Sequence, residues 1–327
     1  MSVPLDPDDI LRNLSRMWTG LGKPVNGTPS EGGVLRACSL TLVVIEAPDE
    51  DSPSLGETLA ALMPRHPARA VVIHSGDAGA PTAQVTAQCW MPFGQHRQIC
   101  CEQIEITTGE NGLNDIVPIL GPIAAPDLPL ILWCRGTEAL RAPSFGRLAA
   151  LAARVIVDSS RCSDPKAAIA TISGLARSIR LGDLSWTRLT RWREMVAEVF
   201  DNPGYAGRIT RIARVRVTYG GAEAPAAAYY MAAWLADSLR RAGARAEVAL
   251  AEEQGAETGR LQAVELSGDG LLVSLRRLRE TLITTADGSS RCIDLPAATD
   301  RLLMEEELDI VRADPVFERT LAAASLA

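Results

Sequence analysis

Four short runs of apolar, largely β-branched residues constrain the fold of this chain more than any other feature. They are CSLTLVVIEA (38–47), RAVVIH (69–74), LPLILWC (128–134) and RVIVD (154–158). Strands without alternation of apolar and polar residues are typical of parallel sheets that helices cover on both faces. A helix is indicated at 164–180, where Asp164 can cap it and Pro165 takes its first position. We therefore expect an α/β fold with an N-terminal, mostly parallel sheet covered by helices.

The pattern changes beyond residue 202. Asp201-Asn-Pro-Gly breaks the chain, and an Ala-rich helix at 224–242 is followed by strands in series. Those strands span 260–267, 271–277, 281–285 and 290–295. Gly268-Asp-Gly270 is a hairpin signal between the first two, so we expect them to be antiparallel. The sequence predicts two domains, 1–202, which includes the helix at 184–200, and a smaller α+β domain at 203–327.

Composition and charge exclude several classes of protein. Hydrophobic residues make up 47% of the 327 residues, charged residues 22%, and the formal net charge is −7. This balance argues against a nucleic-acid binder and against a general attraction to anionic membranes. The opening residues lack the pattern of a signal peptide, and seven irregularly spaced cysteines do not suggest a secreted disulfide framework. We expect a cytoplasmic chain, and its self-association is left open.

The familiar catalytic motifs are missing from the sequence. It contains no G-x-x-x-x-G-K-[ST], G-x-S-x-G, H-E-x-x-H or C-x-x-C, and no G-x-G-x-x-G at a strand-to-helix junction. These absences argue against a familiar nucleotide-dependent enzyme, although they do not exclude catalysis. No residue is assigned as a catalytic group, a cofactor ligand or a metal ligand.

Two polar segments next to apolar strands are candidates for anion binding or for structural roles. His66 and Arg69, at the start of one strand, have the chemistry to hold a phosphate or a partner carboxylate. We favour a rigid turn in which Arg69 binds carbonyls, because functional loops of open α/β sheets lie at the carboxyl ends of strands. Asp158 does lie at such an end and leads into Arg161. A functional site and a hydrogen-bonded loop before Asp164 are equally supported there.

The neighbouring Cys100 and Cys101 are candidates for a redox role. Successive side chains of a strand point to opposite faces, so these two cysteines cannot readily pair with each other. We favour two small apolar residues in a core strand over redox sensing. Glu102, on the same covered strand, must find an arginine or face the solvent.

The most periodic helix is predicted at 184–200. Its apolar face includes Leu189, Val196, Val199 and Phe200, with Trp192 in the middle and Trp186 as an extension. Aromatic and arginine side chains are the usual anchors of protein interfaces, although the central position of Trp192 favours the core. The candidate partner-binding residues are Trp186, Arg188, Arg191, Trp192 and Arg193.

Taken together, several segments resemble the glucose-6-phosphate dehydrogenase assembly proteins, the OpcA family. The segments are HPARAVVI (66–73), ICCEQIEI (99–106), PDLPLILWC (126–134), VIVDSS (155–160), GDLSWTRLTRWREMVAEVFD (182–201) and YYMAAWLADSLR (229–240). The double-tryptophan segment is the most specific. Cys134, where many relatives carry an aromatic residue, and Ala68, where serine is usual, depart from the family pattern.

The resemblance implies a non-enzymatic partner of glucose-6-phosphate dehydrogenase in the oxidative pentose phosphate pathway. Family members are thought to promote assembly of the active oligomer or to activate it allosterically, and the family offers no active site to carry over. Two alternatives stay open. One is an enzyme or sensor that binds a sugar phosphate through Asp158 with Arg69 or Arg161. The other is a redox-gated adaptor that uses Cys100, Cys101, Cys134 or Cys162.

Overall fold

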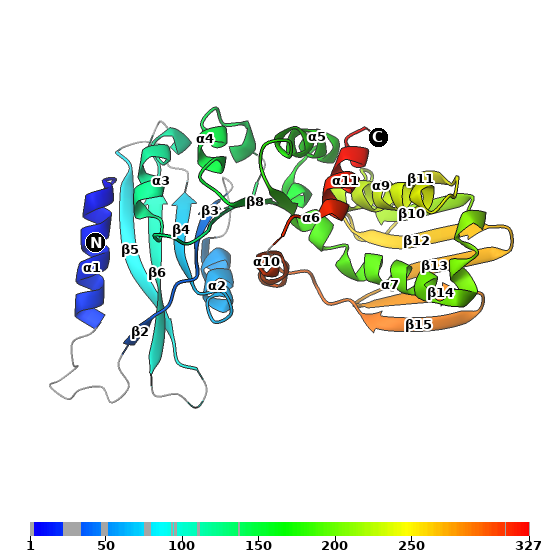
Figure 1. Cartoon of the computed structure of the whole chain (residues 1–327), viewed down its shortest axis with the longest axis horizontal. Helices are drawn as coiled ribbons and strands as arrows, with labels where there is room; N and C mark the ends of the chain where they lie inside the picture. The colour runs from blue at the N-terminus through cyan, green and yellow to red at the C-terminus, as the bar shows by residue number, and fades with distance from the viewer. Residues whose placement is uncertain are drawn as a thin grey trace. The chain divides into compact units, whose positions relative to one another are not determined.

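A computed structural model describes residues 3–21, 34–46, 52–74, 80–92, 94, 97–109, 112–136, 138–310 and 312–326 (Figure 1). Its packing separates two compact units. The first contains the chain up to Val157 together with Ile179–Leu181, and the second contains Asp158–Ser178 and the chain from Gly182 onward. The chain therefore passes from one unit to the other three times.

The first unit is built on a mostly parallel sheet, as expected. Its central strands lie in the order β6-β4-β3-β7-β8, and each neighbouring pair is parallel. Their bounds are β3 (Leu40–Ile45), β4 (Ala68–His74), β6 (Gln98–Thr107), β7 (Leu130–Cys134) and β8 (Arg154–Val157). All six residues of β3 and all four of β8 are buried. The continuous apolar runs thus form strands that are covered on both faces.

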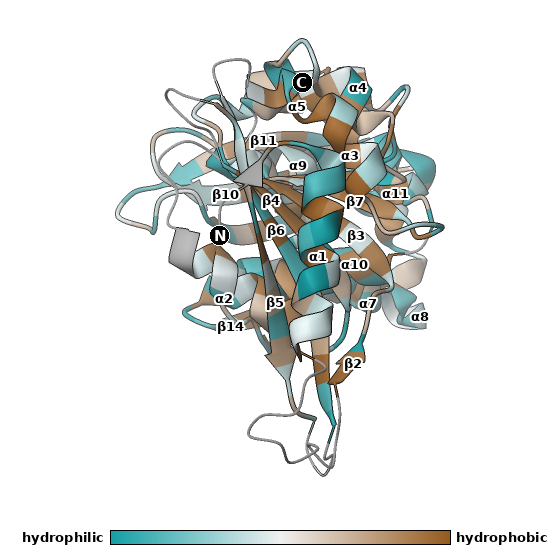
Figure 2. Cartoon of the chain, turned by 90° about the vertical axis from the view of Figure 1, so that its left-hand side faces the viewer, coloured by the Kyte–Doolittle hydropathy of each residue, from teal (hydrophilic) through white to brown (hydrophobic). Residues whose placement is uncertain are grey.

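Helices and an antiparallel edge complete the first unit. Strand β5 (Thr82–Trp90) pairs antiparallel with β6, β1 (Val3–Pro4) extends β5, and β2 (Val34–Arg36) runs parallel to β6. The helices are α1 (Pro7–Leu21), α2 (Ser52–Leu62), α3 (Val117–Ile123) and α4 (Phe145–Ala149), with 3-10 turns η2 (Gly112–Asn114) and η3 (Ala139–Arg141). Figure 2 shows α1 with its hydrophilic side outward, while its Ile10 and Leu14 are buried.

The second unit contains a six-stranded sheet in the order β11-β10-β12-β13-β14-β15. Only β10 and β11 run parallel, and the remaining neighbours are antiparallel. The strands are β10 (Arg214–Gly220), β11 (Glu247–Glu253), β12 (Leu261–Gly268), β13 (Leu271–Leu278), β14 (Thr281–Ala286) and β15 (Ser289–Asp294). The predicted hairpin forms between β12 and β13, where Asp269 and Gly270 take positive φ angles of 40° and 71°.

Helices pack against this sheet and against one another. They are α5 (Pro165–Leu175), α6 (Leu184–Thr187), α7 (Thr190–Asp201), α8 (Pro203–Ala206), α9 (Ala226–Arg241), α10 (Asp300–Asp309) and α11 (Pro315–Ala324). Short elements are η4 (Ser159–Arg161) and η5 (Ile209–Arg211), whereas β9 (Leu181–Asp183) is the neighbour of β8 at the end of the first, nine-stranded sheet. Asp164 caps α5 as predicted, since its side chain accepts a hydrogen bond from the amide of Ala167.

The predicted helix at 184–200 is in fact two helices. It is interrupted after Thr187, and α7 begins at Thr190. Both pieces pack in the second unit, whereas the sequence assigned this segment to the N-terminal domain. An independent folding boundary near residue 202 stays a prediction. Within the described ranges, no helix is both long and apolar enough to cross a membrane.

Candidate functional site

Asp158 lies at the carboxyl end of β8, where the sequence predicted a polar site. Its side chain is fully buried and accepts two hydrogen bonds from Arg188, at 2.8 and 3.0 Å, in a bidentate pair. It also accepts from the backbone and hydroxyl of Ser160, at 3.1 and 2.6 Å. Arg161 lies 3.3 Å from the same carboxylate and bridges to Asp300 at 2.8 Å. These contacts make Asp158 the centre of a closed, hydrogen-bonded loop.

The Arg188 guanidinium remains charged in this half-buried position. Burial, the largest single effect, lowers the pKa of Arg188, but the charge and hydrogen bonds of Asp158 together with the charges of Asp183 and Asp300 outweigh it, and the pKa is raised. A bidentate arginine–carboxylate pair is the geometry that best compensates two buried charges. The sequence placed Asp158 and Arg188 in separate candidate groups, and the structure joins them.

A second buried carboxylate, Asp183, organises the start of α6. It accepts hydrogen bonds from the amides of Ser159 and Ser185, at 3.2 and 2.9 Å, and from the hydroxyl of Tyr230 at 2.8 Å. Burial raises the pKa of Asp183, and the three donors only partly oppose that rise. Burial also raises the pKa of Tyr230 well above its usual value, so the hydroxyl keeps its proton.

Both tryptophans of the predicted partner-binding group are buried. Trp186 and Trp192 are each 3% exposed. The indole of Trp186 donates to Asp314 at 3.0 Å and packs against the rings of Tyr230 and Phe317, with centroids 6.4 and 5.9 Å away. This packing gives Trp186 a core role, which the sequence favoured only for Trp192.

The remaining arginines of that group differ in exposure. Arg193 stacks over Trp186, with its guanidinium carbon 3.7 Å from the ring centroid, and donates to Thr190 at 3.1 Å. Burial lowers the pKa of Arg193. Arg191 is exposed and bridges to Glu194 at 3.1 Å. Partner binding by the five residues stays a prediction, and Arg191 is the member whose charged head faces the solvent.

In the first unit, Arg69 is held by hydrogen bonds to other residues of the protein. Its Nε donates to Glu102 at 2.6 Å and its Nη1 donates to the carbonyl of Ile123 at 2.6 Å. Glu102 also accepts from the indole of Trp18 at 2.6 Å and pairs with Arg36 at 2.7 Å. Glu102 thus found its arginine, and Arg69 binds a carbonyl as the favoured interpretation expected. His66 lies in the turn before β4, with its amide bonded to the carbonyl of Leu62.

The structure also brings together three ionisable residues that sequence reasoning missed. Glu46 follows β3, His74 ends β4 and Arg135 follows β7. The imidazole Nδ1 of His74 bonds to the carboxylate of Glu46, and Arg135 lies 4.0 Å from the other oxygen of Glu46. The guanidinium of Arg135 packs over the ring of Trp133 at 5.4 Å.

This cluster occupies the topological switch point of the sheet. Strand β3 lies between β4 and β7. After β3 the chain forms β4 on one side of it and later forms β7 on the other side. Ligands of open α/β sheets bind at such a point. The signal was present in the sequence, because a charged or titratable residue lies at or directly after the end of each of the three apolar strands. We name Glu46, His74 and Arg135 the switch-point cluster.

The cysteines behave differently from the expectation of two core thiols. Cys100 forms a disulfide with Cys89 of the neighbouring strand, with their Cα atoms 4.1 Å apart. The two residues are register partners on antiparallel strands, and the sequence showed no motif that pairs them. Cys101 faces the other side and is buried, which raises the pKa of its thiol to about 11. Burial also raises the pKa of the Cys134 thiol. A redox role for Cys100 or Cys101 stays a prediction.

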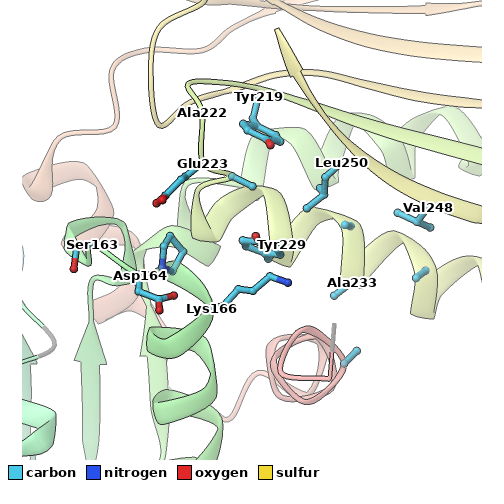
Figure 3. A pocket seen from close by; sticks show the side chains of 15 residues that line it. Ser163, Asp164, Lys166, Tyr219, Ala222, Glu223, Tyr229, Ala233, Val248 and Leu250 are labelled. Atoms are coloured by element: carbon cyan, nitrogen blue, oxygen red, sulfur yellow. The ribbon is translucent and has the colours of Figure 1, made fainter.

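A pocket of about 800 Å³ opens beside β11 in the second unit (Figure 3). Helix α9 contributes Tyr229 and several alanines, and β11 contributes Val248 and Leu250. Asp164 and Lys166 come from the start of α5. The pocket was not predicted, because its walls come from segments that are far apart in the sequence.

Comparison with known protein families shows where the chain belongs. Residues 60–174 match the sequence model described as the glucose-6-phosphate dehydrogenase subunit N-terminal domain, and residues 179–321 match the model of its C-terminal domain. The chain belongs to the OpcA family. The family models meet between residues 174 and 179, close to the point where packing divides the two units.

Curated OpcA relatives support the same assignment. The chain is 31% identical over 194 residues to the OxPP cycle protein OpcA of Nostoc punctiforme, and the match covers 58% of this chain and 40% of that protein. It is 28% identical over 198 residues to the OpcA protein of Synechocystis sp., covering 59% and 41%. The matches span about two fifths of the length of these relatives.

One solved structure that is similar to this chain is a mutant of KijD10, a 3-ketoreductase from Actinomadura kijaniata. It is 12% identical, has a TM-score of 0.47 and covers 90% of this chain and 96% of its own. A likeness at this level assigns no activity to the OpcA-family chain described here.

Proposed function

We propose that this chain is a non-enzymatic partner of glucose-6-phosphate dehydrogenase that favours the active oligomeric state of that enzyme. The observation that carries the proposal is the match of both halves of the chain to the two domains of the glucose-6-phosphate dehydrogenase subunit family. The curated relatives are named for the oxidative pentose phosphate cycle, which is consistent with such a partner.

The mechanism rests on differential affinity. A protein that binds the active dehydrogenase more tightly than the inactive form shifts the population toward the active form by that difference alone. A coupling free energy of about 1–3 kcal/mol corresponds to a shift of roughly 5- to 150-fold. No catalytic group of this chain is needed for that effect.

The closed loop around Asp158 favours this proposal over a sugar-phosphate enzyme or sensor. Such a site requires an arginine or an amide that faces a bound phosphate. Arg188 is instead paired with Asp158, and Arg161 bridges Asp158 and Asp300. Binding a phosphate there would break a buried ion pair, which is strongly unfavourable.

The test mixes the purified chain with the dehydrogenase of the same organism and follows NADPH formation and complex mass together. We expect a complex to form and activity to rise with the same concentration dependence. Conversion of glucose 6-phosphate by the chain alone, or unchanged activity and mass of the dehydrogenase at saturating chain, would refute the proposal.

A charge reversal on α7 tests whether its exposed face takes part. Arg191→Glu places a negative charge beside Glu194, and we expect the half-saturating concentration to rise by about tenfold. Arg301→Glu is the matched control, since Arg301 is also exposed and paired with a glutamate on its own helix. Equal effects of the two reversals would exclude a specific role for α7.

A further inference from the structure

Strand β11 is the edge of the six-stranded sheet, and its outer side carries backbone groups that β10 does not use. In a parallel pair, alternate residues direct both their amide and their carbonyl toward the neighbouring strand. The amide of Glu247 donates a hydrogen bond to the carbonyl of Ala213 at 2.9 Å, so Glu247 is one of the residues whose backbone groups face β10. Ala249 and Ala251 therefore also face β10, while Val248, Leu250 and Glu252 direct their backbone groups outward. In the described part of the chain, no strand pairs with that edge.

The pocket of about 800 Å³ lies directly against this edge. Its floor is a row of small side chains on α9, namely Ala232, Ala233 and Ala236. Figure 3 shows Val248 and Leu250 of β11 and Tyr229 of α9 around the same space. Residues that are directly opposite in a ladder place their side chains on the same face of the sheet. A strand added beside β11 would therefore insert the residues opposite Val248 and Leu250 into the pocket.

Charge at one end of the pocket selects the chemistry of the added strand. Asp164 and Glu223 line the pocket, and Glu252 follows Leu250 on the same face of β11. Lys166 is the single cation among the described lining residues, and its ammonium packs 5.3 Å from the ring centroid of Tyr229. Carboxylates therefore outnumber ammonium groups at the end where β11 finishes. A cationic side chain opposite Glu252 meets this excess of negative charge.

We propose that β11 accepts an extended segment of a partner protein as an additional strand, with two apolar side chains entering the pocket and a lysine or arginine opposite Glu252. The main-chain hydrogen bonds provide affinity and the pocket provides sequence preference, as in other complexes formed by strand addition. The segment has the pattern apolar-x-apolar-x-basic, or its reverse if it runs antiparallel to β11.

A second copy of this chain fits the edge less well than a basic partner segment. Two β11 strands paired antiparallel about Leu250 would place Glu247 opposite Glu253 twice. Like charges directly opposite each other destabilise a sheet. The same arrangement would also put Glu252, rather than an apolar side chain, opposite Val248.

The test measures binding of a fluorescent heptapeptide, acetyl-Thr-Val-Thr-Ile-Thr-Arg-Thr-amide, to the full chain by anisotropy. The apolar and basic residues alternate, so they can share one face of an added strand. Its matched control has the same side chains, but the alternate amides that would donate hydrogen bonds to β11 carry N-methyl groups. We expect the unmodified peptide to bind at concentrations below about 1 mM and the methylated peptide to bind at least roughly tenfold more weakly.

Two variants locate the binding site. Leu250→Pro removes an outward amide and leaves the amides that bond to β10 in place, which edge strands tolerate. Ala236→Trp fills the pocket from an exposed helix position and leaves the sheet unchanged. We expect each to weaken peptide binding by roughly tenfold or more. Glu265→Lys is the control, because Glu265 lies on the opposite face of the sheet and should leave binding unchanged.

Several outcomes would overturn the proposal. They are the absence of peptide binding up to about 1 mM, equal binding of the methylated peptide, or full binding by both Leu250→Pro and Ala236→Trp. A dimer of the chain that Leu250→Pro abolishes would assign the edge to a second copy instead. The test uses no dehydrogenase, so its failure leaves the proposed function untouched, and its success does not depend on that function.

Discussion

Buried carboxylates in both units are compensated by side chains that come from distant parts of the sequence. Glu102 is paired with Arg69, Asp158 with Arg188, and Asp183 with donors from three segments. An uncompensated buried charge is costly, whereas a charge with complete hydrogen bonds is tolerated. These residues therefore hold segments together, and substitutions at them should act on stability first.

Removing the charge of Glu102 should destabilise the first unit. Glu102→Gln leaves the guanidinium of Arg69, which is 4% exposed, without its carboxylate, so we expect a loss of about 3–5 kcal/mol. Urea unfolding followed by circular dichroism measures it. Replacing both members by apolar residues, Arg69→Met with Glu102→Leu, should lose less than the single change. The exposed Glu57→Gln serves as control and should stay within about 0.5 kcal/mol of the parent.

Asp183 should make the folded state less stable as pH rises. Its pKa is raised by burial, so the folded chain binds its proton more tightly than the unfolded chain does. The stability contribution is therefore fully present below the unfolded pKa of about 3.9 and is lost as pH rises toward the folded value. The difference in unfolding free energy, parent minus Asp183→Asn, should fall as pH rises above about 4. A flat or rising difference over that range would contradict the assignment.

At the level of elements, local sequence signals predicted many strands and helices but not their interruptions. The strands predicted at 271–277 and 281–285 match β13 and β14 to within one residue. The break between α6 and α7 could not be predicted, because it depends on distant partners. On either side of the break, Trp186 packs on Phe317 and Arg188 pairs with Asp158, contacts to residues far away in the sequence.

At the candidate sites, too, the sequence predicted local features but not the distant residues that pair with them. Asp158 was placed at a strand end from its sequence context alone, and Glu102 was expected to find an arginine or face the solvent. The identity of Arg188 as the partner of Asp158, and the pairing of Cys89 with Cys100, depend on strand register and on chain crossings. Neither leaves a local pattern in the sequence. The switch-point cluster, by contrast, was accessible from the residues that end three apolar strands.

The hairpin of β5 and β6 should carry a covalent link. We expect denatured, unreduced chain to show five reactive thiols and reduced chain to show seven, since two of the seven cysteines form the disulfide. Thiol titration in denaturant measures both numbers. Cys89→Ala with Cys100→Ala should also lower stability by about 2–4 kcal/mol, because closing the loop restricts the unfolded chain. Cys292→Ala is the control at an exposed position. Seven thiols before reduction would rule out the link.

At the scale of the whole molecule, the two compact units are not consecutive pieces of chain. Segment 158–178 belongs to the second unit, and Ile179–Leu181 returns to the first. The aromatic cluster of the second unit combines Trp186 with Tyr230 and Phe317. A cut near residue 202 would separate Trp186 from both partners.

Fragments cut at residue 202 should therefore not behave as two folded domains. We expect fragment 203–327 to unfold without a cooperative thermal transition, since it lacks Asp183, which accepts the hydrogen bond of Tyr230, and Trp186, whose ring packs on Tyr230. Fragment 158–327 contains the whole aromatic cluster and should unfold cooperatively. Circular dichroism during heating compares the two fragments with the full chain. A cooperative transition in 203–327 equal to that of 158–327 would instead support the predicted boundary.

The interleaved path of the chain also has a consequence during synthesis. Helix α5 leaves the ribosome before α9 and α11, the helices against which it packs in its own unit. Translation adds about 5–20 residues per second, so roughly ten to thirty seconds separate α5 from the end of α11. Helix α9 emerges before α11, so the apolar side of α5, with Ile169 and Ile172, lacks one or both of these native neighbours until α11 has been made. Nascent chains of this protein should therefore present a binding site for chaperones at α5 until α11 has left the ribosome.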